Sequence, residues 1–105
     1  MKNFYNTVTT ITTTISGTNE SKKMTYADLA LLTLNIPPRN GWTKEEMKIR
    51  FKIEDKLEKL KPGESAQLED AEFEKVFECS NQPWQFKHRD LLKYMNDLEK
   101  EYKKE

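Results

Sequence analysis

The sequence predicts an all-α fold, a small bundle of three to four short helices that follows an N-terminal threonine-rich arm. Three observations lead to this fold class. Helix start signals of the capping-box type occur at Thr25 and Thr43. Apolar residues then recur at helical spacing in segments that are separated by the helix-breaking prolines Pro37, Pro38, Pro62 and Pro83. A chain of 105 residues has room for one small domain.

Residues 1–23 differ in composition from the rest and are predicted to form an arm, extended or weakly structured on its own. Threonine dominates the uncharged stretch from Thr7 to Thr18, and its β-branched side chain prefers an extended backbone. A disordered terminus is the alternative. The domain formed by residues 24–105 has its own caps and apolar stripes, so we expect it to fold without the arm. The arm residues expected to contact a partner are Phe4, Val8, Ile11 and Ile15.

The first helix is expected to begin at Thr25 and to end before Pro37. Thr25 and Asp28 form a T-x-x-D start, and Met24 and Leu29 flank this start at the spacing of a hydrophobic staple. The residue before a proline avoids the α region, so the prolines at 37 and 38 end the helix. Its apolar face consists of Leu29, Leu32 and Ile36.

The second helix has the clearest start signal in the chain. Thr43 and Glu46 form a T-x-x-E capping box, and the staple spacing of Trp42 and Met47 predicts that Trp42 enters the core. Met47 and Phe51 lie on a second apolar arc, further round the helix than the main stripe. An apolar surface this wide is typical of a helix that contacts two neighbours. The main stripe consists of Ile49, Ile53, Leu57 and Leu60.

The remainder of the chain is expected to hold a connector and two more helices. Residues 64–68 form the connector, in which Ala66 and Leu68 can point inward. Asp70 is a plausible N-cap for a third helix that buries Phe73, Val76 and Phe77 and ends at residues 80–83. The last helix begins near Lys87. Its stripe, typical of a helix that faces a core, consists of Leu91, Met95, Leu98 and Tyr102.

Composition and motifs argue against catalysis, cofactors and membranes. The 18 basic and 18 acidic residues cancel, so no long-range field favours nucleic acid or an anionic membrane. One histidine and one cysteine cannot form a metal cluster, and three isolated glycines form no phosphate-binding loop. No apolar run reaches the roughly 18 residues that span a bilayer. The sequence predicts a non-enzymatic protein with no metal, no cofactor and no membrane contact.

A cluster at the start of the last helix is chemically unusual. Positive side chains there oppose the helix dipole, whereas a bound anion would reverse the sign of that interaction. The candidate contacts for an anion or a nucleic acid are Trp84, Lys87, His88 and Arg89. The alternative is that Asp90 neutralises the cluster and that Trp84 packs into the core.

Three runs carry a resemblance to a group of known proteins. They are residues 26–29 (YADL), 36–47 (IPPRNGWTKEEM) and 68–73 (LEDAEF). Through them the block from Met24 to Tyr102 resembles small, uncharacterised helical proteins encoded by bacteriophages. The resemblance implies an accessory protein of a phage or mobile element, and it implies no active-site residues.

These exclusions and the arm together predict a protein–protein interaction or assembly protein, such as a structural or accessory component of a phage. Its expected partner is another protein chain, either a second copy or a different protein. Its expected location is the cytoplasm of a host cell or the virion. The alternative function is a small nucleic-acid-binding regulator that uses the N-terminal end of the last helix, although the neutral net charge disfavours it.

Overall fold

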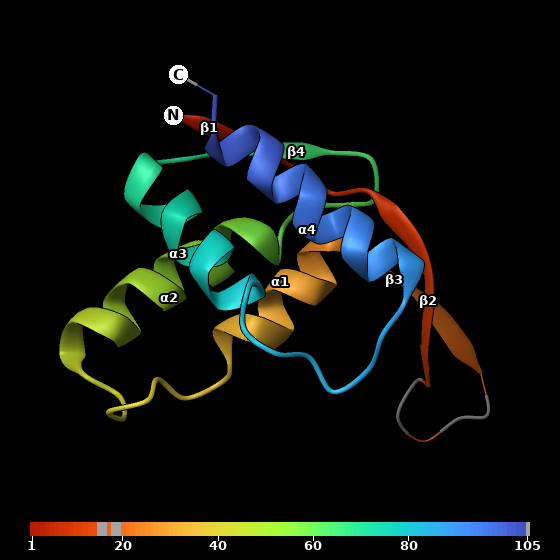
Figure 1. Ribbon diagram of the computed structural model, residues 1–105, viewed down its shortest axis with the longest axis horizontal. Helices are drawn as coiled ribbons and strands as arrows, with labels where there is room; N and C mark the ends of the chain where they lie inside the picture. The colour runs from red at the N-terminus through yellow and green to blue at the C-terminus, as the bar shows by residue number, and fades with distance from the viewer. Residues whose placement is uncertain (15–16, 18–19, 105) are drawn as a thin grey trace.

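The computed structural model describes residues 1–14, 17 and 20–104, in which helices and strands are mixed (Figure 1). The strands are β1 (Lys2–Tyr5), β2 (Val8–Thr14), β3 (Ser21–Thr25) and β4 (Ser65–Leu68). The helices are α1 (Tyr26–Leu34), α2 (Lys44–Leu57), α3 (Asp70–Ser80) and α4 (Arg89–Tyr102). The fold class is therefore α+β, and the prediction of an all-α bundle is wrong.

Two antiparallel two-stranded sheets account for the difference. Strand β1 pairs with β4, with Phe4 opposite Ala66, and strand β2 pairs with β3 as a hairpin. The hairpin follows the β preference of its threonines. The segment expected as a connector is strand β4, whose partner β1 lies at the other end of the sequence. A pairing between such distant segments leaves no local signal, which is why helical periodicity alone missed it.

The N-terminal segment contributes to the folded core. Phe4 is only 1% exposed, and Ile11 is buried with it among side chains from all four helices. At the start of α4, the Asp90 carboxylate accepts hydrogen bonds from the backbone N–H and the Oγ1 of Thr10, both at 2.7 Å. Beyond this contact the hairpin projects from the body (Figure 1). Strands β1 and β2 thus differ from the separate arm expected for residues 1–23.

The helix starts lie within two residues of those expected from the sequence, whereas α2 ends at Leu57, before Leu60 of its expected stripe. The capping box at the start of α1 is present, because Thr25 and Asp28 exchange side-chain to backbone hydrogen bonds. At α2, the Oγ1 of Thr43 accepts the Glu46 N–H at 3.1 Å. The N-cap of α3 is Glu69, one residue before the expected Asp70. Caps are recognisable in sequence because they join residues only three positions apart.

The apolar stripe of α4 is only partly as expected. Leu91 and Leu98 are buried, whereas Tyr102 lies at the surface. Tyr94, which the predicted stripe omitted, is fully buried, and its hydroxyl lies 2.8 Å from the Oγ of Ser80. A buried hydroxyl needs such a partner, and no pattern within α4 itself reveals one on α3.

Candidate functional site

The apolar residues expected to bind a partner through the arm do not form an exposed surface. Phe4 and Ile11 are buried in the core. Val8 is about half exposed and lines a pocket between the hairpin and the ends of α1 and α2. Ile15 lies outside the described residues. The arm is therefore not the candidate site of interaction.

The positive cluster is found at the start of α4, as expected, but much of its hydrogen-bonding capacity is used. The Nδ1 of His88 accepts the Asp90 N–H at 3.0 Å, so the imidazole is the N-cap of the helix. The hydrogen bonds from Thr10 hold the pKa of Asp90 below its usual range. Lys87 and Arg89 are exposed. A negative carboxylate and a side-chain cap already occupy the helix terminus where an anion would bind.

Trp84 is half buried and serves the packing between α3 and α4. Its indole Nε1–H donates to the carbonyl oxygen of Ser80 at 2.9 Å. Its ring meets the rings of Phe86 and Tyr94 edge to face, with centroids 5.9 and 6.4 Å away. Aromatic pairs favour this geometry. The contacts explain the position of Trp84 without a bound nucleic acid.

Helix α2 has two apolar arcs, and only one of them is covered. Ile53 and Leu57 on the main stripe are buried against the body of the protein. On the second arc Phe51 is 59% exposed, and Met47 is exposed as well. The width of the apolar surface predicted two neighbours for this helix. In the part of the chain that the structure describes, the second arc stays largely exposed beside Trp42 and the end of α1.

Trp42 is 42% exposed, which corrects the prediction that it enters the core. The guanidinium of Arg50 lies 4.8 Å from the centroid of its ring, a cation–π contact. The Nη1 of Arg50 donates to the carbonyl oxygens of Leu34 at 3.1 Å and of Ile36 at 2.7 Å. These hydrogen bonds to the C-terminal end of α1 hold the Arg50 guanidinium against the inner face of the Trp42 indole. The indole therefore stays at the surface.

A pocket of about 220 Å³ lies beside the uncovered arc. Aromatic and aliphatic side chains dominate its walls, and the charged groups are at Arg50 and Glu54. Exposed aromatic and methionine side chains around a pocket are typical of the central part of protein interfaces. The lining residues are Leu34, Asn35, Trp42, Met47, Arg50, Phe51 and Glu54.

The exposed charges beside the arc are separated by sign along α2. Positions three or four residues from Met47 and Phe51 share their side of the helix. Of the exposed charged residues there, Lys44, Lys48, Asp55 and Glu58 form no ion pair with another described residue. Burial and the nearby carboxylates of Glu58 and Asp55 raise the pKa of Glu54. On this side of the helix, the exposed basic residues are Lys44 and Lys48 near its start, and the acidic residues near its end are the half-buried Glu54 and the exposed Asp55 and Glu58.

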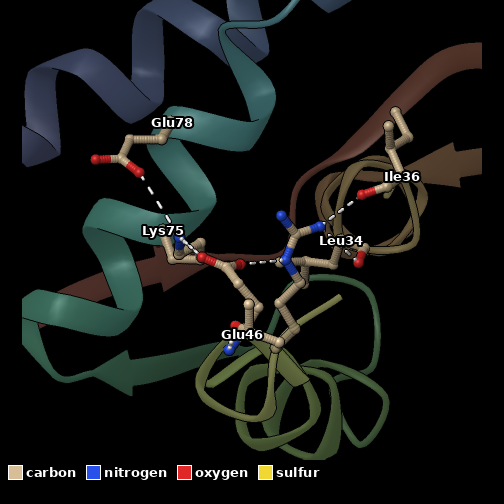
Figure 2. Close-up of polar contacts among 7 residues, drawn as sticks. Leu34, Ile36, Glu46, Lys75 and Glu78 are labelled. Atoms are coloured by element: carbon tan, nitrogen blue, oxygen red, sulfur yellow. Dashed lines mark hydrogen bonds and ion pairs between the residues drawn. The ribbon is translucent and has the colours of Figure 1, made fainter. Parts of the chain in front are cut away.

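Glu46 joins α2 to α3 by bridging two cations (Figure 2). Its Oε1 lies 2.7 Å from the Nζ of Lys75, and its Oε2 lies 3.0 Å from the Nε of Arg50. The hydrogen bond from Lys75, and then that from Arg50, lower the pKa of Glu46. The i,i+4 spacing of Glu46 and Arg50 is a sequence signal for their pairing. Lys75 approaches from α3 and is also 3.8 Å from Glu78, contacts that sequence reasoning missed.

The same network lines a cleft of about 490 Å³ between α1, α2 and α3. Cys79 is half buried in the cleft wall. Burial raises the pKa of the Cys79 thiol, which disfavours the nucleophilic thiolate form. The charged residues of the cleft are Arg39, Glu46, Arg50, Lys75 and Glu78.

No protein-family model, curated protein or solved structure matches the chain. Within residues 1–14, 17 and 20–104, no three or more His, Cys, Asp or Glu side chains are grouped so that they could hold a metal ion. Over the same residues, no helix has the length and apolar character needed to cross a membrane. The function is inferred from the uncovered arc of α2 and the pocket beside it.

Proposed function

We propose that the protein is a non-enzymatic assembly protein that pairs with a second copy of itself through the uncovered arc of α2. The observation that carries this proposal is the exposure of Met47 and Phe51 on one side of the helix, beside the exposed ring of Trp42. Large contiguous apolar patches are rare on monomeric proteins and mark surfaces that another molecule covers.

The charge pattern on α2 favours a second copy in antiparallel orientation. In that orientation Lys44 and Lys48 of one copy lie along the acidic half of the other helix, from Glu54 to Glu58. The two-fold symmetry of such a pair makes every favourable contact occur twice. The arrangement also places cations near Glu54, whose pKa is raised in the single chain by burial and by the neighbouring carboxylates. Charge complementarity of this kind sets the orientation of an interface more than its affinity.

The pocket beside the arc supplies a place for an anchoring side chain. At about 220 Å³ it is smaller than the roughly 300–1,000 Å³ of typical small-molecule sites. One large apolar side chain from the partner helix is the occupant that its size and lining support. Buried aromatic anchors in such pockets carry much of the binding energy at protein interfaces.

Light scattering coupled to size-exclusion chromatography tests the proposal over a range of concentrations. We expect a dimer whose population rises with concentration, and a monomer at every concentration for Phe51→Glu. Leu92→Glu is the matched control, because Leu92 is 61% exposed on α4, outside the arc. A monomeric unaltered chain at all concentrations would contradict the proposal.

The alternative function, a nucleic-acid-binding regulator, has less support. It relies on the start of α4, where His88 caps the Asp90 N–H and the Asp90 carboxylate is bound by Thr10. An assembly protein also fits the accessory role in a phage or mobile element that the resemblance of residues 24–102 implies.

A further inference from the structure

We propose that the cleft between α1, α2 and α3 binds a carboxylate group that carries an apolar substituent. The cleft measures about 490 Å³, within the usual range of sites for small ligands. It shares only Arg50 with the pocket beside the α2 arc. The inference therefore does not depend on the pairing of two copies.

Arg50 provides the first argument, because one of its nitrogens has no partner. Its side chain is only 7% exposed, its Nε binds Glu46, and its Nη1 donates to two carbonyl oxygens. Its Nη2 donates to no residue in the described part of the chain. Among the described residues, the only fully enclosed side-chain polar atom without a hydrogen-bond partner is the Oε2 of Glu72, so the unpartnered Nη2 is open to solvent or a ligand. A guanidinium buried to this degree normally has its donors satisfied, so Nη2 is available to an acceptor.

The balance of charge provides the second argument and indicates a single negative charge. The cleft is lined by three cations, Arg39, Arg50 and Lys75, and by two carboxylates, Glu46 and Glu78. The difference is one positive charge, which one carboxylate would neutralise. Arg39 is exposed and forms no ion pair with any other described residue. Arginine and lysine bind carboxylates through short, charge-assisted hydrogen bonds.

The third argument is an apolar pocket of about 260 Å³ that adjoins the cleft. Ile36, Cys79 and Pro83 line both cavities, so the two lie side by side. The pocket continues past them to Leu32 and Phe86, which are exposed although apolar. A ligand that spans both cavities places its carboxylate near the cations and its apolar group against these side chains. Covering them removes apolar surface from water.

Two sources supply this chemistry, namely the C-terminal residue of a polypeptide and a free carboxylic acid. The probes are a hexapeptide that ends in leucine with a free carboxylate, the same peptide with a C-terminal amide, and octanoate. Titration calorimetry measures their affinities. We expect a carboxylate probe to bind at least about tenfold more tightly than the amide, the effect of one lost charge-assisted hydrogen bond. If the peptide acid binds more tightly than octanoate, the natural ligand is the C-terminal residue of a polypeptide. If octanoate binds more tightly, the natural ligand is a free carboxylic acid.

Variants of the cleft complete the test. Arg39→Gln and Lys75→Gln should each weaken the binding of the carboxylate probe several-fold, whereas Lys59→Gln, which alters an exposed lysine that lines neither the cleft nor the adjoining pocket, should not. Phe51→Glu should bind the probe normally, which separates this site from the α2 arc. Because Cys79 lies in the wall, bound probe should also slow its alkylation by iodoacetamide in the unaltered chain. Equal binding of acid and amide, or no binding with no protection of Cys79, would overturn the proposal.

Discussion

The side-chain carbonyl of Asn6 accepts the backbone N–H of Ala27 at 2.8 Å, which fastens the N-terminal segment to the first turn of α1. The Nδ2 of Asn6 donates to the Leu60 carbonyl oxygen at 3.3 Å. Its backbone N–H donates to Glu64, and its backbone carbonyl accepts from Gly63, both at 2.8 Å. One buried asparagine thus joins the strand region, α1 and the turn before β4.

Substitution of this asparagine should be costly. Asn6→Ala leaves the Ala27 N–H and the Leu60 carbonyl oxygen without their side-chain partners, and each such loss in a buried site costs about 1–3 kcal/mol. We therefore expect the free energy of unfolding to fall by roughly 2–4 kcal/mol in urea titrations. Asn96→Ala, at an exposed position on α4, is the control. A loss no larger than that of the control would show that the Asn6 contacts contribute little.

Removal of the N-terminal strands should unfold the domain. A chain that lacks residues 2–14 loses the buried Phe4 and Ile11, the Asn6 contacts and the partner strand of β4. Deletion of one large buried apolar side chain alone costs about 3–5 kcal/mol, a major share of the stability of a small domain. Circular dichroism should show the loss of a cooperative thermal transition. A truncated chain that melts like the full chain would mean that these strands are dispensable.

Acid should weaken the link between α2 and α3. The hydrogen bond from Lys75 holds the pKa of Glu46 below its ordinary value of 4.5. The ionised form therefore stabilises the fold above pH 4.5, and this stabilisation is lost as the pH falls below that value. Glu46→Gln should be less stable than the unaltered chain at neutral pH and should lose less stability on acidification.

Urea titrations at pH 7 and at a pH below 4.5 measure this difference. Glu74→Gln is the control, because Glu74 is exposed on α3 and forms no ion pair with another described residue. If Glu46→Gln and the control show the same dependence on pH, the Lys75 contact does not couple protonation to folding.

Exchange of charges should report the orientation of the two copies. We expect the double variant Lys44→Glu, Lys48→Glu to lose self-association, and Asp55→Lys, Glu58→Lys to lose it as well. A mixture of the two should form a heterodimer, because opposite charges then face each other in the antiparallel arrangement. Light scattering of the mixture measures how much dimer forms again. A mixture that stays monomeric would argue against the antiparallel register, while the Phe51→Glu result tests the surface itself.

Much of the helical part of the fold follows from the sequence, because the deciding contacts are local. Thr25 binds Asp28 and Thr43 binds the N–H of Glu46 within a single helical turn. Gly63 ends the turn after α2 with a φ of +87°, a conformation that glycine adopts without strain. The two apolar arcs of α2 are also visible as spacing. Each of these signals is complete within a few consecutive residues.

The candidate site could be predicted only in part. The exposed arc of Met47 and Phe51 follows from helical spacing, but the sequence could not show which arc the body covers. Trp42 has the spacing of a buried staple residue. Its place at the surface depends on Arg50, which binds the carbonyl oxygens at the end of α1 and lies against the indole ring. The cleft likewise needs Lys75 from α3 to meet Glu46 from α2.

The sequence by itself determined, to within two residues, where the helices begin and which residues α2 presents on its two arcs. Only the tertiary structure decided that Phe4 enters the core, that β1 pairs with β4, and that Asn6 completes the start of α1. A helix cap or an apolar stripe is formed by residues that are close along the chain, so their spacing in the sequence reveals it. A strand gains its hydrogen bonds from a distant segment, so its place is settled when the two segments meet in the folded chain.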